Sequence, residues 1–443
     1  MKNLKFLLFA LGLMLLIAAC GGSDTAEPAA EEVAQEQVVP TPTLAVEATL
    51  PPPVVSVDGE AVNNAPPAGD PAQPVPADPV VTSAIIRPWP QDKFGYGTQL
   101  HGNATVGDPV STMDSARNQL GVDWVKIQIQ WWLVKPDPEA DQWFFYDGVI
   151  DEANKAGLNV MLSVVGAPAW TRAAGGEHGP PDDYNEYAKF LTEMINRHPD
   201  KIGAIEVWNE QNLDREWQSA NGVNPEDYVR FLQVAHDAIK AADPNIIVIS
   251  GALAPTGGGD WIAYIDDFAW MDRALAAGML NYADCVGAHH NGYNIPPDVP
   301  FDQAPNLPEA ATAVFRGPFD NPHHSWSMKT TFDTYAEKIQ AIDPNAKLCV
   351  TEFGWASSEG YETSPTGFEF ANDNTLEEQA QYITQAYQMM HDSGDVWLAF
   401  LFNFDFGNKG SGPTDDPVPY SIVDINGLPR PAFGAISAME KTP

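Results

Sequence analysis

Two glutamates of this 443-residue chain stand in settings that suit acid–base chemistry. Glu210 lies two residues after the short β-rich run 204–208, and Glu352 ends the run 347–352. Two carboxyl groups that flank a glycosidic bond can hydrolyse it. One protonates the leaving oxygen, so its pKa must be raised, and the other stays ionised and attacks the anomeric carbon. This chemistry requires a fold that brings the two residues together.

The two runs next to these glutamates belong to a repeated pattern, in which short β-rich segments alternate with longer amphipathic ones. Apolar residues recur at three- and four-residue spacing over 184–197 and 225–242, which predicts helices. Gly121 and Gly157 stand where a glycine ends a helix just before a strand. The predicted strands cover 94–100, 123–130, 158–165, 204–208, 246–250, 284–289, 347–352 and 397–403.

Eight such repeats predict an α/β fold, namely a (β/α)8 TIM barrel with enlarged βα loops over residues 85–443. A doubly wound sheet is the alternative. The first predicted strand, however, lacks the GxGxxG turn of that fold, and Gly257–Gly259 has no Lys-Ser/Thr pair to bind phosphate. Catalytic groups of a TIM barrel lie at the carboxyl ends of its strands. Strands four and seven oppose each other, so Glu210 and Glu352 are expected to converge across the barrel mouth.

The Trp-Asn-Glu motif ending at Glu210 and the Thr-Glu-Phe-Gly motif around Glu352 resemble the signatures of clan A glycoside hydrolases. The resemblance is nearest to the cellulase-like members of families 39 and 5. It implies a retaining enzyme for β-linked glycans, with Glu210 as acid/base and Glu352 as nucleophile. It also implies that Asn209 binds the sugar 2-hydroxyl, that His289 lines the sugar site and that Tyr293 contacts the nucleophile. The residues inserted between His289 and Tyr293 leave these last two roles open.

Two positions depart from the clan pattern. Lys126 stands where many relatives have Arg, and a lysine cannot form a bidentate clamp on the nucleophile. Phe402 stands where relatives commonly place a Trp under the sugar, and it can still offer an apolar platform. Both are predicted to lie at the substrate site. Further candidate sugar platforms follow other strand ends, with core packing at the barrel rim as the alternative for each: Trp132, Trp170, Trp355, and also Trp131 and Trp217.

Histidine pairs raise the alternative of a metal site. His289 and His290 are adjacent, as are His323 and His324. Neighbouring residues of a strand point apart, and neither an HExxH motif nor a pair of cysteines accompanies them. We therefore expect no metal and no cofactor. Glu206, inside the fourth predicted strand, is expected to pair with a Lys or Arg of the barrel.

The two cysteines of the predicted barrel lie in apolar runs. Cys285 precedes His289 by four residues, and Cys349 precedes Glu352 by three. Because side chains alternate along a strand, this difference predicts that the two cysteines point to opposite sides of the barrel wall. A disulfide between them is therefore not expected.

The N-terminal region predicts export. Residues 1–20 have a basic start and an apolar stretch too short to span a membrane, which is typical of a signal peptide. The peptide ends in Ala-Ala before Cys20, which resembles a bacterial lipobox and implies lipidation of Cys20; a plain signal peptide is the alternative. Residues 21–84 contain twelve prolines, ten acidic residues and no Lys or Arg, which predicts a disordered linker. The expected location is the bacterial cell surface or the periplasmic face of the membrane.

The net charge of −37 excludes nucleic acid as a partner, since such a surface repels phosphate backbones. A neutral carbohydrate substrate meets no such barrier, and we expect a monomer. Two alternatives stay open. One is a surface glycan-binding lipoprotein on a catalytically degenerate barrel, which the departures at Lys126 and Phe402 favour. The other is a solute-binding lipoprotein of an uptake system, which would need two α/β lobes and neither glutamate.

Overall fold

The computed structural model describes residues 85–101, 109–173, 178–260 and 262–442. The predicted signal peptide, Cys20 and the predicted linker 21–84 lie outside the described residues. All eight predicted strands are present within one or a few residues of their expected bounds. They are β1 Gly95–Gln99, β2 Trp124–Gln130, β3 Asn159–Val165, β4 Ala204–Val207, β5 Ile247–Ser250, β6 Val286–Gly292, β7 Leu348–Trp355 and β8 Val396–Leu401.

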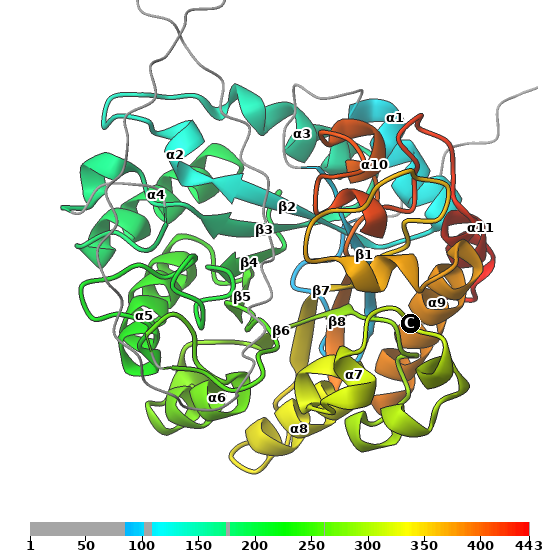
Figure 1. Cartoon of the computed structure of the whole chain (residues 1–443). Coiled ribbons are helices and arrows are strands. Elements are labelled where there is room, and N and C mark those ends of the chain that lie inside the picture. Colours follow the sequence, from blue (N-terminus) through cyan, green and yellow to red (C-terminus); the bar gives the residue numbers. More distant parts are fainter. Residues whose placement is uncertain (1–84, 102–108, 174–177, 261, 443) are drawn as a thin grey trace, which may run out of the picture. The chain divides into compact units, whose positions relative to one another are not determined.

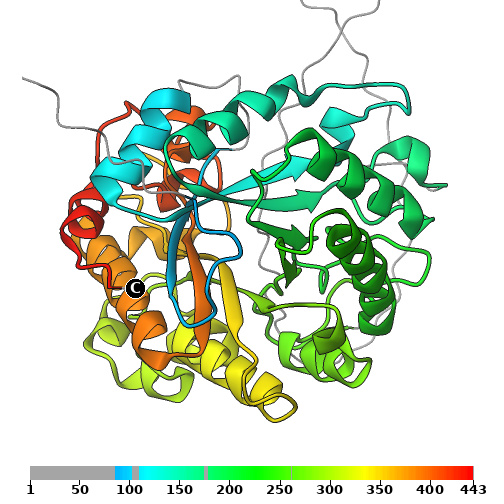
Figure 2. The same cartoon turned by 180° about the vertical axis from the view of Figure 1, so that it is seen from behind.

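The strands form a parallel sheet in the order β5-β4-β3-β2-β1-β8-β7-β6. Backbone bonds between β5 and the two residues that precede β6 close it. The Asp284 N–H donates to the Val248 carbonyl (2.8 Å), and the Ser250 N–H donates to the Cys285 carbonyl (3.2 Å). Helices surround the closed sheet, as Figure 1 shows from one side and Figure 2 from behind. The predicted (β/α)8 TIM barrel is confirmed.

The helices begin and end at residues with the expected local chemistry. The Asn224 side chain accepts from the Asp227 N–H at the start of α5, where Pro225 occupies the first turn. Gly121 and Gly157 have positive φ after helical turns, as predicted. The predicted helices 184–197 and 225–242 match α4 and α5. The α-helices are α1 Pro109–Asp114, α2 Trp131–Val134, α3 Asp147–Lys155, α4 Tyr184–Arg197, α5 Pro225–Ala242, α6 Asp267–Ala276, α7 Gly317–Asp320, α8 Met328–Gln340, α9 Leu376–Ser393, α10 Phe406–Lys409 and α11 Pro431–Ala438.

Shorter helical segments lie mostly in the loops that follow the strands. A π-helical turn, Ser115–Leu120, extends α1. The 3-10 segments are Trp143–Phe145, Ala169–Thr171, Met279–Asn281, Phe301–Asn306, Pro308–Ala311, His324–Trp326, Glu369–Asn372 and Val418–Tyr420. Among the described residues, none of these helices has the length and apolar character that a bilayer crossing requires.

The barrel interior near the amino ends of the strands is an apolar layer. Two of its aromatic members, Trp124 and Phe400, meet edge to face with ring centroids 6.2 Å apart. They fit because β1 offers no side chain there: a Cβ on Gly97 would lie 2.5 Å from the Phe400 ring. Close packing of this kind makes the barrel a solid core. The other buried members of the layer are Trp89, Met161, Ala204, Ile247, Ile249, Cys285, Cys349, Trp397 and Leu398.

Cys285 and Cys349 form a disulfide in this apolar layer, so the expectation that they point apart is wrong. Counting by twos holds only along a regular strand. The register of β7 against β6 shifts just before His289, and Thr351 is the extra residue on β7. Such a bulge reverses the alternation between Cys349 and Glu352. Cys349 and Glu352 can therefore both face the barrel interior.

Candidate active site

The backbone after β4 turns sharply and directs Glu210 into the barrel mouth. Trp208 and Glu210 have φ of 77° and 43°, in the left-handed region that residues with side chains seldom adopt. Trp208 is held there because its Nε1 donates to the Glu216 carbonyl (2.8 Å), while the Glu210 N–H donates to the Ala252 carbonyl (2.8 Å). Strained backbone of this kind clusters at functional sites.

Both carboxylate oxygens of Glu210 contact basic side chains. Oε1 lies 3.3 Å from Nδ1 of His289, and Oε2 accepts from Nη2 of Arg215 (3.1 Å). Burial raises the pKa of this carboxyl, but the His289 bond and the Arg215 charge together outweigh burial and lower the pKa to about 2. The raised pKa expected of an acid catalyst is therefore wrong for this arrangement of side chains, in which Glu210 is ionised.

Glu352 lies on β7 and is held from two sides. Its Oε1 accepts from Nζ of Lys126 (3.0 Å), and its Oε2 accepts from Nδ2 of Asn291 (3.4 Å). The strand continues to Trp355, beyond its predicted end. Position 354 of the motif requires glycine, because a Cβ there would lie only 2.1 Å from the Phe402 carbonyl oxygen of the neighbouring chain segment.

Lys126 lies beneath Glu352 and is fully buried. Its Nζ is 3.2 Å from Oε2 of Glu206, and it donates to the Thr351 carbonyl (3.1 Å). Burial opposes the charged form, but Glu206 and Glu352 raise the pKa of Lys126 above its ordinary value. The predicted pairing of Glu206 with a barrel Lys is confirmed. Lys126 has no exposed surface for a sugar, so its predicted place among the substrate-binding residues is wrong: it holds Glu352 instead.

His289 lies between Glu210 and Glu206, whereas His290 points away from them. Nε2 of His289 is 3.8 Å from Oε1 of Glu206, which completes a network from Glu210 to Lys126. Burial lowers the pKa of His289, but the Glu352 and Glu210 carboxylates outweigh burial and raise it. His290 contacts the Ser325 carbonyl with Nε2 (3.2 Å), and burial lowers its pKa to about 3. The two adjacent histidines point apart, as predicted.

Tyr293 and Asn209 are both buried near Glu210. Burial, and then the charge of Glu210, raise the pKa of the Tyr293 phenol. Asn209 is 3% exposed, and its side chain lies beside the Glu216 carboxyl. It does not cap the next helix, since Asn224 does. The expected contacts of Asn209 with a sugar and of Tyr293 with the nucleophile remain predictions.

The sequence of the barrel matches one family of glycoside hydrolases. The family model for cellulase (glycosyl hydrolase family 5) matches residues 91–405. The chain belongs to this family. The match covers all eight strands and both motifs around Glu210 and Glu352.

Individual relatives of this family 5 barrel are distant. A β-xylosidase of Geobacillus stearothermophilus is 33% identical over 95 residues, which are 20% of this chain and only 18% of that protein. The structure of a β-xylosidase from Caulobacter crescentus CB15 superposes with a TM-score of 0.52 at 16% identity, over 80% of this chain and 69% of that one. The structure of xylanase 10B from Thermotoga maritima superposes with a TM-score of 0.51 at 14% identity, over 79% of this chain and 95% of that one. At these identities the solved structures show the fold alone.

The aromatic candidates of the family 5 barrel differ in exposure. Trp170 is 38% exposed and donates through Nε1 to the Lys135 carbonyl (2.8 Å), while Trp132 is partly exposed. Phe402 is 9% exposed beside Tyr420, with ring centroids 5.6 Å apart. Trp355 is 1% exposed, so it has no free ring face and its predicted role as a sugar platform does not fit. Trp131 and Trp217 are likewise core residues.

Three residues at the site were not singled out from the sequence. Asn291 contacts Glu352, and the alternation of β6 from His289 would have indicated it. Arg215 contacts Glu210, and Glu216 lies beside both, in a loop that follows β4. Loop residues carry no periodic signal, so nothing in the spacing pointed to this pair.

One group of described residues has donors close enough for a metal ion: Asp266, His323 and His324. Their contacts already have a structural use. His324 bonds Asp267 through Nε2 (2.8 Å), and His323 accepts the Ser325 N–H at Nδ1 (3.3 Å). The His324 bond fastens the loop after β6 to the start of α6, and the His323 bond holds the turn within that loop. Neither His289 nor His290 belongs to the group.

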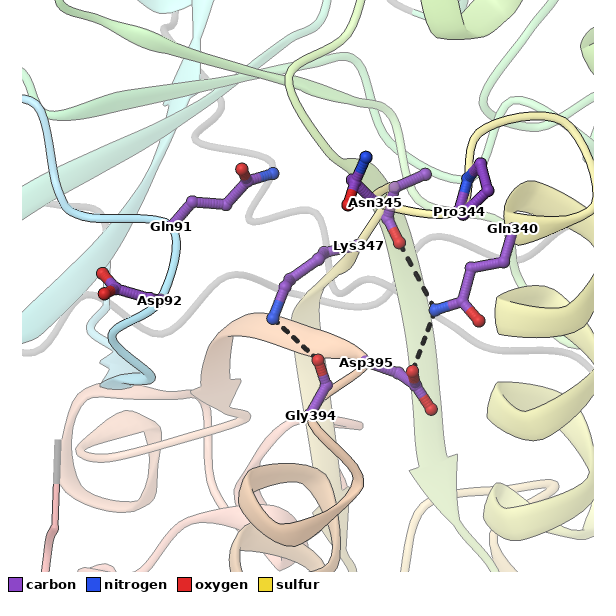
Figure 3. A pocket seen from close by; sticks show the side chains of 9 residues that line it. Gln91, Asp92, Gln340, Pro344, Asn345, Lys347, Gly394 and Asp395 are labelled. Atoms are coloured by element: carbon purple, nitrogen blue, oxygen red, sulfur yellow. Dashed lines mark hydrogen bonds between the residues drawn. The ribbon is translucent and has the colours of Figure 1, made fainter.

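A hollow of about 570 Å³ lies at the other end of the barrel (Figure 3). Four of the residues that line the hollow are joined by hydrogen bonds. Lys347, which precedes β7, donates to the Gly394 carbonyl (2.7 Å). Gln340 donates to the carboxylate of Asp395, which precedes β8 (2.8 Å). Because the hollow adjoins the amino ends of the strands, it is remote from Glu210 and Glu352. In TIM barrels this end serves stability, and active sites lie at the other.

Proposed function

We propose that this family 5 chain is a retaining hydrolase of β-linked glycans or oligosaccharides. The observation that carries the proposal is the joint placement of Glu210 and Glu352. They come from the opposing strands β4 and β7, and both contact one buried network through His289 and Lys126. Two carboxyl groups at one barrel mouth are what double displacement requires.

In the proposed reaction Glu352 attacks the anomeric carbon while Glu210 gives a proton to the leaving oxygen. Lys126 and Asn291 each donate a hydrogen bond to one oxygen of the Glu352 carboxylate and so hold it in position for attack. Water then hydrolyses the glycosyl-enzyme, with Glu210 as base. The exposed ring of Trp170 and the apolar side chain of Phe402 are the proposed contacts for sugar rings.

The decisive experiment has two readouts. The protein is assayed on aryl β-glycosides and soluble polysaccharides, and the anomer first released is identified by NMR; retention is expected. A 2-deoxy-2-fluoro glycoside of the best substrate should label Glu352, as located by peptide mass spectrometry. Glu352→Gln should not be labelled, whereas Glu337→Gln, an exposed control on α8, should be. Inversion, or a label elsewhere, contradicts the mechanism. Glycan binding without any turnover supports the degenerate barrel instead.

We also propose that the chain is exported and anchored to a membrane through lipid on Cys20. The lipobox-like sequence and the linker composition support this, and so does the buried disulfide, since disulfides persist in oxidising compartments. Metabolic labelling with a fatty acid should mark the parent chain and not Cys20→Ser. Equal labelling of both chains would exclude the lipobox. Because one chain carries both glutamates, a monomer is expected, which light scattering of a form lacking residues 1–20 can check.

A further inference from the structure

The contacts of Glu210 are wrong for an acid that must hold a proton. His289 and Arg215 each contact one of its oxygens, and both stabilise the carboxylate. One of them must withdraw before Glu210 can be protonated. His289 is 1% exposed and enclosed by the network of Glu206. Arg215 is a long side chain, 32% exposed, on the loop after β4. Arg215 is therefore the group that can move.

A second partner for Arg215 stands next to it in the chain. The backbone of Glu216 is fixed, because its N–H donates to the Leu213 carbonyl (3.1 Å) and its carbonyl accepts from Trp208. Its half-buried carboxyl forms no ion pair with any residue of the described ranges. Burial, and then the charge of Glu210, raise the pKa of Glu216 to about 8. Of the two carboxyl groups Glu210 and Glu216, it is therefore Glu216 that carries a proton at neutral pH.

We propose that Arg215 and Glu216 form a proton-delivery pair that prepares Glu210 for catalysis. Arg215 turns from Glu210 to Glu216, and the proton of the Glu216 carboxyl passes to the Glu210 carboxylate. Before the step Arg215 pairs with ionised Glu210 and Glu216 is neutral. After it Arg215 pairs with ionised Glu216 and Glu210 is neutral, so protons and net charge balance. The inference rests on the proposed function, since it assigns Glu216 a positioning role toward the acid/base.

The pH dependence follows from treating the two carboxyls as one titrating unit. When the shared proton leaves at alkaline pH, Glu210 can no longer be protonated, so kcat/KM should fall above a pH of about 8. Other ionisable groups facing Glu210 and Glu216 contribute to this value and are present in every variant below: His289, Tyr293, Glu352 and Tyr420.

The first test is Glu216→Gln, which keeps the size of the side chain and removes both the proton site and the second partner of Arg215. The alkaline limb of kcat/KM should move to lower pH by about one unit or more. At pH 7 turnover of a glycoside with a poor leaving group should fall about tenfold or more, since general acid catalysis is lost. An activated aryl glycoside, which needs little protonation, should change far less. Glu377→Gln, an exposed control on α9, should behave as the parent chain.

The second test is a double-mutant cycle with Arg215→Met. Without the guanidinium, the pKa of Glu210 rises, so Glu210 no longer needs Glu216 as a proton source or as an alternative partner for Arg215. Glu216→Gln should then have little further effect in the Arg215→Met background. Additive losses in the two backgrounds, or an alkaline limb that neither variant moves, would overturn the inference. If Glu216→Gln does not fold, the single Arg215→Met variant still decides, because its alkaline limb must move to higher pH.

Failure of the inference is distinguishable from failure of the proposed function. A parent chain that turns over glycosides and is labelled at Glu352, but shows additive losses in the cycle, disproves only the proton-delivery pair. A parent chain without turnover or label disproves both.

Discussion

The two halves of the barrel interior are built from the same strands and have opposite chemistry. On β2 the inward residue changes from Trp124 to Lys126 two positions later, and on β4 it changes from Ala204 to Glu206. The amino-end layer is apolar and is crosslinked by a disulfide, whereas the carboxyl-end layer buries charges. Apolar packing stabilises a fold, while buried ion pairs seldom do so better than apolar residues would. The amino-end layer therefore stabilises the fold, whereas the carboxyl-end layer provides the charged groups for chemistry.

The largest expected effect lies in the charged layer. Glu352→Ala removes the proposed nucleophile, so activity on every substrate should fall by roughly 10⁴-fold or more. Glu210→Ala should largely spare glycosylation by activated substrates but trap the glycosyl-enzyme, since no base then activates water. Azide should rescue Glu210→Ala with a β-glycosyl azide and Glu352→Ala with the α-product, as judged by NMR. Equal losses without rescue would mean that the two roles are misassigned.

Removal of the buried lysine should damage both stability and activity. Lys126→Met leaves Glu206 and Glu352 without their shared cation, which should lower the free energy of unfolding by about 3–5 kcal/mol. The double variant Lys126→Met/Glu206→Gln should recover part of the stability without recovering kcat. Urea unfolding and steady-state kinetics measure the two effects. A single variant as stable as the parent chain would break the contrast between the layers.

Loss of the disulfide should affect stability alone. Cys285→Ala/Cys349→Ala should lower the free energy of unfolding by about 2–4 kcal/mol, because the crosslink restricts the unfolded chain over a sequence separation of 64 residues. Below the unfolding temperature, kcat/KM should equal that of the parent chain. A loss of activity in the folded double variant would show that the apolar layer also positions Glu352.

The smallest expected effect concerns an exposed platform at the mouth. Trp170→Ala removes a ring that is 38% exposed, so KM should rise by roughly 2- to 10-fold, as expected for one aromatic contact of about 0.5–1.5 kcal/mol. Stability and kcat should change little. Ile342→Ala, which removes another exposed apolar side chain, should leave KM unchanged. Thermal unfolding together with a substrate titration distinguishes a binding role for Trp170 from a packing role.

The sequence by itself determined the barrel and the place of its two glutamates. Strands and helices follow from local periodicity and from capping residues such as Asn224, and these signals extend over only a few neighbours. The count of strands then placed Glu210 and Glu352 on opposing sides of one mouth, and the family motifs agreed with that count. Lipidation at Cys20 and the linker were also read from the sequence and remain predictions.

Only the tertiary structure decided how the side chains at the site are paired. The bulge at Thr351 reversed the alternation along β7 and brought Cys349 to Cys285. The turn after β4 carried Arg215 to Glu210, which lowers a pKa that the sequence required to be raised. Burial removed Trp355 from the mouth. In each case the deciding contact is between groups far apart in the chain or in an irregular turn, and neither leaves a periodic pattern in the sequence.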